Sequence, residues 1–533
     1  MTPTAQWAVN AMRVDPEEDA HRPWREFAFR ENRLPLFLGI VCLSLLSSGT
    51  IYAQADGWIT APVSTDSPNQ QVPLVDHPTT SQVSIVAERA SWEQELRPTS
   101  SLNQPVDDTR GESGLDAIDT GGTSPSLQPL PSWLEEVNVG YNRGFVIASE
   151  PDPGLDTSGV PFLLRLNGFG QLRETRFDSR SGNPDLNQFQ LIRGRLTFSG
   201  NAFTPDFRYF IQLDGRSSAG DEFRLLDYFM EFDLGRNWLD LNRNALVFKT
   251  GRYKVPFSFA RFMSSREFQF SDRSMGSMYF DLNRSMAWGL GGRSQWRGMP
   301  LIWETSLYNG FVTGGAETGS FGALDDNFAF SARIFAFPMG DWGAGTLADF
   351  DWHETLATRV GAAYAGTTIG REGSTEFNMI RVVDSGNRLG NLLPDAVDEY
   401  HVDTFCVDAS CKYRGWSATS EYYFRNISGF QGAELPGLFD HGFWLQVGKF
   451  VVPRKLELLS RWSRVVGTSG TLGVDHQSAD ELAGGCVWYF RDQHAKLTVD
   501  ATWLNGAPIN SSALDISAGA IGWLVRTQIQ FAF

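Results

Sequence analysis

The sequence predicts an all-β fold, a transmembrane antiparallel β-barrel of about 16 strands. Three observations lead to this fold class. Apolar and polar side chains alternate with a period of two over many short segments. The connections between these segments alternate between short and long, and the chain ends in an amphipathic segment that closes on Phe533. A signal peptide and a disordered linker are predicted to precede the barrel.

The composition excludes several other classes of protein. The chain has 533 residues, of which 42% are hydrophobic and 13% aromatic, and its formal net charge is −17. With 45 basic against 62 acidic residues, binding to nucleic acid is disfavoured. The longest apolar run, from Leu34 to Leu46, is too short to cross a bilayer as a helix. A helical membrane protein is therefore excluded, whereas barrel strands never form such runs.

The first region in chain order, residues 1–55, reads as a leader and signal peptide. Arg30 and Arg33 precede the apolar run, and an Ala-x-Ala cleavage pattern that ends at Ala55 follows it. We expect export through this cleavable signal, with Asp56 as the mature N-terminus. A short buried helix is the alternative. The region before the run is long and carries acidic residues, so the exact translation start is left open.

Residues 56–160 form an acidic segment of low complexity. They hold four basic and 16 acidic side chains and are rich in Ser, Thr, Pro, Asp and Gln. Such a composition buries too little apolar surface to offset the entropy lost on ordering. We predict a disordered periplasmic segment here and the outer-membrane barrel over residues 161–533, where the net charge is −4.

The strands of the barrel follow from alternation. Arg193 and Arg195, for example, alternate with apolar neighbours, so both arginines share one face of a strand. Each predicted strand has about 10 residues, the length of a tilted membrane-spanning strand. The predicted strands are 162–173, 188–200, 205–214, 222–234, 245–254, 286–297, 301–312, 327–338, 356–367, 402–413, 415–427, 440–452, 455–466, 482–491, 495–504 and 520–533.

The connections favour an outer-membrane barrel over a soluble sandwich or propeller. Connections after several even-numbered strands are short, such as 297–300 and 452–454, whereas 255–285 and 368–401 follow odd-numbered strands and are long. Outer-membrane barrels have tight periplasmic turns and long outer loops. The last strand, which places Val525 and Ile529 on one face and ends in Phe533, is typical of these proteins.

A barrel of this size predicts a channel. The alternating ionised side chains need water, so the lumen must be wet, and a barrel near 16 strands is wide enough for an aqueous pore. The expected function is an outer-membrane porin for passive diffusion of small solutes in the bacterial outer membrane. Outer-membrane lipid and lipopolysaccharide are expected partners, and nucleic acid is not.

A basic window indicates a preference for anions such as phosphate or polyphosphate. Residues 241–297 hold 10 basic and three acidic side chains, centred on the third outer loop, which is long enough to fold into the lumen. Arginine suits bidentate binding of phosphate. The alternative is a basic outer loop that faces lipopolysaccharide or solvent. The candidate anion-binding and pore-lining residues are Arg193, Arg195, Arg252, Lys254, Arg261, Arg266, Arg273 and Arg284.

Several motifs stand out within the barrel region. They are Lys249-Thr-Gly-Arg-Tyr-Lys-Val-Pro-Phe257, Ser271-Asp-Arg-Ser274, Asn283-Arg284, Glu421-Tyr-Tyr-Phe-Arg425 and Gly448-Lys-Phe-Val-Val-Pro-Arg-Lys-Leu-Glu457. With these motifs the chain resembles the phosphate-selective porin O and P family over about residues 162–533. The resemblance implies a trimeric, 16-stranded channel whose infolded third loop carries basic residues that attract phosphate-like anions. The sequence departs from the family at Ala260, where the family usually has Glu.

No catalytic constellation emerges, so an enzyme is not expected. The chain has no H-E-x-x-H, Walker or G-x-S-x-G motif, and no metal or cofactor is predicted. Cys406, Cys411 and Cys486 are interpreted as structural, with Cys406 and Cys411 on opposite faces of one strand. A non-selective general porin, or a barrel-anchored adhesin or cell-wall linker protein that uses 56–160, is the alternative function.

Overall fold

The computed structural model describes 137–141, 144–149, 160–182, 184–216, 222–311, 324–343, 347–371, 376–382, 387–467, 472, 478–506 and 519–533. These residues all belong to Thr80–Phe533, the second of two units into which the chain divides. The predicted signal peptide and most of the predicted linker lie outside the described residues.

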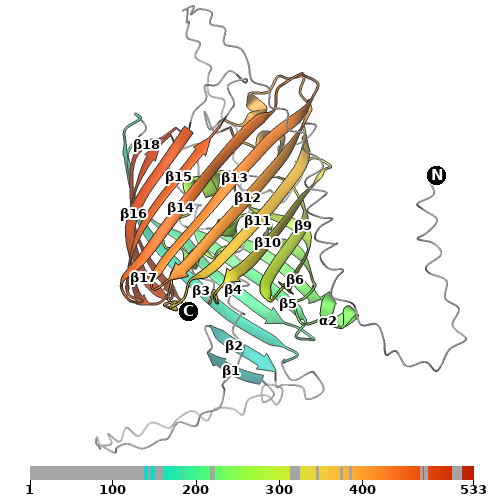
Figure 1. The fold of residues 1–533 in the computed structure, drawn as a ribbon, viewed down its shortest axis with the longest axis vertical. Helices are drawn as coiled ribbons and strands as arrows, with labels where there is room; N and C mark the ends of the chain where they lie inside the picture. Colours follow the sequence, from blue (N-terminus) through green and yellow to red (C-terminus); the bar gives the residue numbers. More distant parts are fainter. Residues whose placement is uncertain are drawn as a thin grey trace, which may run out of the picture. The chain divides into compact units, whose positions relative to one another are not determined.

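Sixteen antiparallel strands close into a barrel (Figure 1). Each strand from β3 to β18 pairs with its neighbours in the sequence, and β18 pairs with β3 to complete the ring. The fold class and the strand number are confirmed, and each predicted strand overlaps one observed strand. The barrel strands are β3 (Leu163–Ser179), β4 (Leu186–Asn201), β5 (Phe207–Arg216), β6 (Glu222–Asp233), β7 (Val247–Lys254), β8 (Arg284–Trp296), β9 (Met299–Asn309), β10 (Phe328–Met339), β11 (Ala357–Gly370), β12 (Glu399–Tyr413), β13 (Trp416–Gln431), β14 (Leu438–Val452), β15 (Leu456–Val466), β16 (Ser478–Arg491), β17 (Ala495–Asn505) and β18 (Ile521–Ala532).

Burial alternates along the strands as the sequence pattern predicts. In β15, Glu457 and Arg461 are buried inside the ring, whereas Leu458 and Trp462 are exposed on its outer surface. A period of two sends successive side chains to opposite faces, so the polar set faces the lumen. Cys406 in β12 is buried and Cys411 is half-buried, on opposite faces as expected, and both are free thiols.

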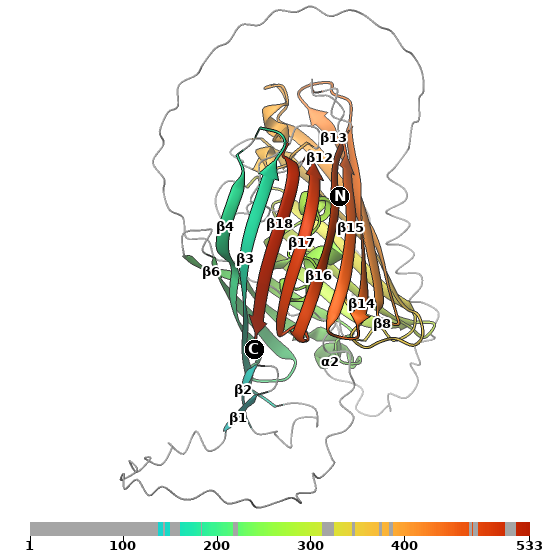
Figure 2. The same cartoon turned by 90° about the vertical axis from the view of Figure 1, so that its left-hand side faces the viewer.

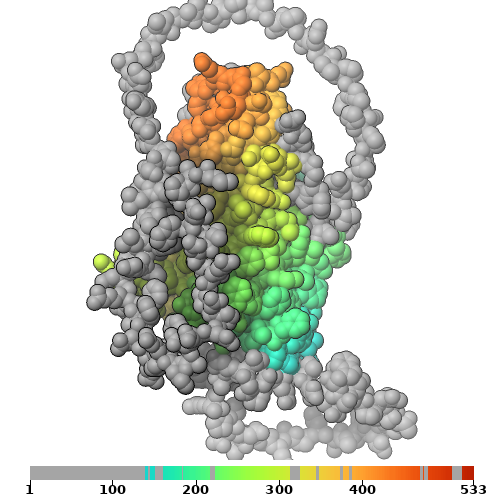
Figure 3. All heavy atoms as spheres, turned by 90° about the vertical axis from the view of Figure 1, so that its right-hand side faces the viewer, coloured from blue at the N-terminus to red at the C-terminus, as the bar shows by residue number. Residues whose placement is uncertain are grey.

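Tight turns join strands at one end of the barrel. The connections Arg297-Gly298 and Arg414-Gly415 each contain two residues, and all four have positive φ angles between 45° and 80°. Two-residue hairpin loops of this kind match the twist of the flanking strands and require positive φ at both positions, which favours glycine. Long connections lie at the opposite end of the barrel, among them the orange segments near residue 400 (Figures 1 and 3).

A hairpin precedes the barrel, inside the segment that was predicted to be disordered. β1 (Val137–Tyr141) pairs with β2 (Phe145–Ser149), and β2 pairs with the start of β3 where β18 no longer covers that strand. The rings of Phe145 and Phe533 lie 5.9 Å apart, next to the C-terminus (Figure 2). The prediction of disorder is therefore wrong for 137–141 and 144–149, because β3 is 17 residues long and leaves an edge to pair with.

The helices are short. α2 (Leu234–Leu239) joins β6 to β7; α3 (Phe259–Phe262), η5 (Ser265–Glu267) and α4 (Met275–Phe280) lie between β7 and β8; η6 (Glu376–Asn378) and η7 (Leu389–Asn391) lie between β11 and β12. In the described part of the chain, no helix combines the length and apolar character needed to cross a bilayer.

Candidate functional site

The connection between β7 and β8, residues 255–283, lies inside the barrel, and we call it the lumen segment. Its helices are visible behind the strands in Figures 1 and 2. Ser264, Arg266 and Arg273 are half-buried, and every other residue of the segment is buried. The predicted infolding of the third outer loop is confirmed.

Serine residues start each short helix of the lumen segment. The side chains of Ser258, Ser264 and Ser274 accept hydrogen bonds from backbone N–H groups in the first turns of α3, η5 and α4. Serine is a favoured N-cap because its hydroxyl satisfies an amide that the helix leaves unpaired. The sequence thus breaks the segment into single turns, which fit a narrow lumen better than one long helix.

Carboxylates on the barrel wall accept hydrogen bonds from backbone N–H groups of the lumen segment. Three strands supply them. The bonds run from Phe259 (2.7 Å) and Ala260 (3.0 Å) to Glu421 on β13, from Met275 to Glu481 on β16, and from Ser271 to Asp500 on β17 (2.9 Å).

Cations on the wall donate to backbone carbonyl groups of the same segment. The bonds run from Arg333 to Phe257, from Lys254 to Met263 (3.2 Å), from Lys496 to Arg266 (2.8 Å) and Phe268 (2.6 Å), from Arg173 to Ser271 (2.6 Å), and from Arg461 to Asp272 (2.8 Å). Buried backbone groups need partners, and irregular backbone at membrane depth is tolerated where protein supplies them. The charged wall therefore stabilises the segment.

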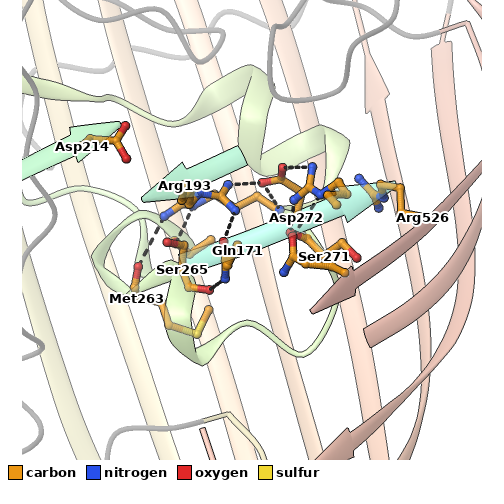
Figure 4. A network of polar contacts seen from close by, with 12 residues as sticks. Gln171, Arg193, Asp214, Met263, Ser265, Ser271, Asp272 and Arg526 are labelled. Carbon is orange, nitrogen blue, oxygen red and sulfur yellow. Dashed lines mark hydrogen bonds and ion pairs between the residues drawn. The ribbon is translucent and has the colours of Figure 1, made fainter. Parts of the chain in front are cut away.

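Asp272 connects the lumen segment to arginines of the first barrel strands (Figure 4). Its two carboxylate oxygens lie 3.2 Å from a guanidinium nitrogen of Arg173 on β3 and 3.0 Å from one of Arg193 on β4. Arg193 also donates to Gln171 (2.8 Å). Nearby, Arg526 on β18 lies 2.8 Å from Asp500. All these charged side chains are buried.

The structure places most of the predicted site residues at or beside the lumen segment, but several of them are paired there with a carboxylate or a hydroxyl group. Arg195 contacts Asp214 (3.1 Å) and Ser265 (2.9 Å), Arg261 lies 3.6 Å from Asp281, and Arg284 lies 3.0 Å from Asp227. Buried arginines with a carboxylate at this distance are largely neutralised as pairs. These residues, with Arg193 and Lys254, hold the lumen segment and the adjoining wall together.

Arg266 and Arg273 differ from the other predicted residues because they are half-buried. The Arg266 side chain is 19% exposed and lies 4.0 Å from Glu267. The Arg273 guanidinium donates to the carbonyl groups of Ala260 (2.9 Å) and Met263 (3.3 Å), and lies 4.5 Å from the centre of the Phe268 ring. Among the charged residues of the lumen segment, these two are the ones that are not buried.

Arg252 is not among the half-buried arginines. In the strand ladder it stands opposite Tyr228 and Met286, and Met286 is 40% exposed on the outer surface. Paired residues in antiparallel strands share a face. Arg252 itself is only 4% exposed, and the φ of 123° at Gly251 interrupts the strict alternation of β7 just before it, as the buried, lumen-facing Lys254 two residues further on illustrates. Its pore-lining role stays a prediction.

Sequence reasoning missed a larger set of lumen-facing cations. These are Arg173, Arg333, Arg359, Lys412, Arg425, Arg461 and Lys496, all buried on inward-facing strand positions. The alternation that identified Arg193 and Arg195 also marks them. The basic window drew attention to one stretch of chain, whereas the cations come from both halves of the barrel.

One group in the described residues has the spacing of metal ligands, namely Cys406, Asp408 and Glu421. The oxygens of Glu421 already accept the hydrogen bonds from the lumen segment, and Asp408 is paired with Arg333 and Arg359. These donors occupy the positions that a cation would need. The group therefore serves as a hydrogen-bond centre.

The motifs that resemble the phosphate-selective porins meet in space. Glu421 accepts hydrogen bonds from the turn that follows Phe257, and Arg425 donates to Tyr279 of the lumen segment (2.6 Å). Glu457 accepts from Gln269, at 2.5 Å. These motif residues position the lumen segment.

No protein-family model and no curated protein matches the chain. Among solved structures, the chain is similar to the outer-membrane channel DcaP of Acinetobacter baumannii, with 8% identity, a TM-score of 0.44 and coverage of 69% of this chain and 97% of that chain. An anion-selective porin from Comamonas acidovorans has 9% identity, a TM-score of 0.44 and coverage of 69% and 99%. OmpF of Salmonella typhi, in complex with daunomycin, has 12% identity, a TM-score of 0.42 and coverage of 70% and 98%. The fold assignment rests on the strand pairing of this chain itself.

Proposed function

We propose that the protein is an outer-membrane porin for passive diffusion of small solutes, with a preference for anions such as phosphate. The observation that carries this proposal is the closed ring of 16 strands with charged side chains inside, apolar side chains outside and a segment folded into the lumen. In a bilayer a sheet must close so that no backbone group lacks a partner.

The outer surface supports a membrane location. Outward-facing Leu172, Trp288 and Leu482 are exposed to 57%, 70% and 60%. Exposed aromatic residues gather at both ends of the strands, as in the girdles that membrane barrels place at the two interfaces. Those at the end with the tight turns include Trp296, Trp416, Trp488 and Phe531, and those at the opposite end include Phe189, Phe328, Phe439 and Trp523.

Further parts of the proposal follow from a membrane barrel. The tight turns and the C-terminus face the periplasm, and the long connections face outward, towards lipopolysaccharide. The chain is exported through a signal peptide, assembles as a homotrimer and belongs to the phosphate-selective porin O and P family as a distant member. No catalytic role and no cofactor is part of the proposal.

The anion preference rests on Arg266 and Arg273. Both are half-buried on the lumen segment, so a solute that passes this segment can reach part of each side chain. Charged side chains at a constriction set selectivity because water is scarce there and their field is weakly screened. The second candidate, a non-selective general porin, is favoured by the carboxylates that pair with Arg193, Arg195, Arg261 and Arg284.

Planar-bilayer recording on the purified full-length protein tests the proposal. We expect stepwise conductance, a reversal potential in a KCl gradient that shows chloride preference, and a chloride current that added phosphate reduces. A reversal potential near zero, without block by phosphate, would favour the general porin. Cation-selective current would contradict the anion preference, and the absence of any current from folded protein would contradict the porin function.

A further inference from the structure

Large apolar side chains are exposed on α2 and on the turn between β4 and β5, at the end of the barrel that carries the tight turns. Trp238 and Leu239 of α2 are 73% and 56% exposed, Leu241 just after the helix is 46% exposed, and Phe203 in the turn is 83% exposed. We call these four residues the α2 patch. Figure 1 shows α2 standing out from the barrel beside β5 and β6. Apolar side chains gathered in this way mark an interaction surface.

Hydrogen bonds hold the α2 patch in place before any partner binds. The side chain of Asp233, at the end of β6, accepts the amide of Asn244 (2.6 Å), which closes the connection between β6 and β7 into a compact turn. Asn237 donates to Asp206 (3.2 Å), which ties α2 to the turn between β4 and β5. Because the surface is already ordered, binding to it costs little conformational entropy.

The α2 patch continues the outer surface of the barrel. The ring of Trp238 lies 6.0 Å from that of Phe232 on β6, and the ring of Phe203 lies 6.2 Å from that of Phe207 on β5. Phe207 and Phe232 stand opposite each other in the strand ladder, and Met230, which shares the face of Phe232, is 52% exposed on the outside. The patch therefore adjoins the surface that faces acyl chains in a membrane barrel.

The strands that adjoin the α2 patch include the two shortest of the barrel. β7 has eight residues and β5 has 10, whereas the other barrel strands have between 11 and 17. A strand needs about 9–11 residues to cross the hydrocarbon core, so the apolar height of the wall is lowest on this side. A wall that is too short for the bilayer is costly, and added apolar surface at the strand ends lowers that cost. The short strands therefore favour lipid as the partner of the patch.

Two arginines and two carboxylates flank the α2 patch. Arg236 and Arg243 lie 3.7 Å and 3.9 Å from the carboxylate of Asp206, and their side chains are 26% and 38% exposed. Arginine suits phosphate, and tryptophan beside arginine at the edge of an apolar surface is typical of anchors at the membrane–water interface. Asp240, which ends α2, is exposed, so these charges balance. A zwitterionic phospholipid therefore fits the patch.

We propose that the α2 patch binds phospholipid and enters the leaflet on the side of the tight turns. Its four apolar side chains lie at the boundary between headgroups and acyl chains, and Arg236 and Arg243 contact phosphate groups there. The patch thereby extends the lipid-facing wall where the strands are shortest. The inference rests on the membrane location in the proposed function and goes beyond conduction, because it assigns α2 a lipid partner of its own.

Quenching of tryptophan fluorescence by brominated phosphatidylcholine tests this proposal on the full-length protein in vesicles. The chain has 17 Trp residues, so the Trp238 signal is taken as the difference between the wild type and Trp238→Tyr. An interfacial apolar side chain lies within about 5–10 Å of the headgroup boundary, so bromine near the glycerol end of the acyl chains should quench this signal about twofold more than bromine at the middle of the bilayer. Leu239→Trp, added to Trp238→Tyr, should restore the shallow quenching.

Trp342→Tyr is the matched control. Trp342 lies near the same end of the barrel, but its ring is buried inside, with its centre 4.2 Å from the ammonium group of Lys412. Its difference signal should be insensitive to both brominated lipids. If Trp238→Tyr fails to fold, as judged by heat-dependent gel mobility, Leu239→Trp alone should add a signal with shallow quenching to that of the wild type.

Equal quenching of the Trp238 signal by the two lipids, or no quenching, overturns the proposal. Quenching by iodide in the water instead would place the patch in solvent, and a lower oligomer mass of Trp238→Asp would assign it to a contact with a second copy of the chain. A protein that shows the shallow quenching but does not conduct contradicts the porin function and leaves the lipid contact in place. A conducting pore without this quenching loses only the lipid contact.

Discussion

The lumen segment and the connection between β11 and β12, residues 371–398, are similar in length and share one buried apolar cluster, but many more charged wall side chains bind the backbone of the lumen segment. Charged side chains of the wall bind the backbone of the lumen segment on both sides. The connection 371–398, which we call the rim connection, packs through apolar side chains. Its buried apolar residues are Phe377, Ile380, Val382, Leu389, Leu393 and Val397.

The difference follows from the surroundings of each segment. Inside the lumen the wall is lined with ionised and other polar groups, so a segment that enters satisfies its backbone with them, including neutral side chains such as Ser463 and Gln171. At the rim the chain can bury apolar surface against itself and the strand ends, as Phe377 does against Tyr400 (ring centres 4.9 Å apart). The lumen segment should therefore respond to the removal of charge, and the rim connection to changes in burial and pH.

The largest effect is expected for Glu421→Ala. Glu421 accepts hydrogen bonds from the amides of Phe259 and Ala260, from Tyr423 (2.8 Å) and from Trp444 (3.1 Å). Its loss leaves several buried donors without an acceptor, which costs about 3–5 kcal/mol. Urea unfolding in detergent should show this loss, and single-channel recordings should show a noisier, larger conductance as the lumen segment loosens.

Glu421→Gln is the control for that prediction. It keeps one acceptor oxygen and the size of the side chain, so about half of the loss should be recovered. If Glu421→Ala and Glu421→Gln both destabilise the protein only slightly and by the same amount, the hydrogen bonds to the wall do not hold the lumen segment. The contrast with the rim connection would then disappear.

A pH dependence of intermediate size is expected at the rim. Glu376 in η6 accepts a hydrogen bond from the amide of Phe311, and burial, with a smaller effect of Asp325, raises its pKa from 4.5 to about 7. A carboxyl group that binds its proton more tightly in the folded state stabilises that state at low pH. The stability of the rim connection should fall as pH rises from 4.5 to about 7, by about 2–3 kcal/mol, and level off above.

Hydrogen exchange of the amides around η6, corrected for intrinsic rates, measures this slope. Glu376→Gln should be as protected at pH 8 as at pH 5, whereas the wild type should lose protection over the same range. A slope that persists in Glu376→Gln would assign the titration to another group.

The smallest effect concerns selectivity. Replacing Arg266 and Arg273 by Gln removes the half-buried charges and should lower the chloride-to-potassium permeability ratio by about two- to threefold, because selectivity follows charge at the constriction. The same change at Arg261 and Arg284, which are paired with Asp281 and Asp227, should alter stability more than selectivity. Reversal potentials in a KCl gradient compare the two double variants, and equal shifts would show that burial and pairing do not decide which cations act on the solute.

The alternation of apolar and polar residues let the sequence predict all the strands of the barrel. The length and the basic residues of the connection after the fifth predicted strand indicated the lumen segment. The period of two is a local property, so each strand can be identified without its neighbours. Lys249 and Tyr253 illustrate the rule in β7: both occupy inward-facing positions and contact each other there, with the Lys249 ammonium 4.4 Å from the Tyr253 ring centre.

The partners of the charges could not be predicted in this way. Asp272 and Arg173 are far apart in the sequence and meet because the lumen segment enters the ring and reaches β3. The hairpin of β1 and β2 was missed because its few residues were grouped with the acidic segment around them, although its strands contain no Asp or Glu, and its stability comes from pairing with β3. Both features depend on non-local contacts, which no local pattern records.

The bonds of Ser271 set an order of events in assembly. Its carbonyl group binds Arg173 on the first strand of the ring, and its amide binds Asp500 on the strand before the last. Neither the emerging chain nor an open sheet can make both bonds, since the two strands come together only when the ring closes. The lumen segment can therefore dock fully only after the last strands have joined the sheet. Once docked, it links the first and last strands of the ring from inside the barrel.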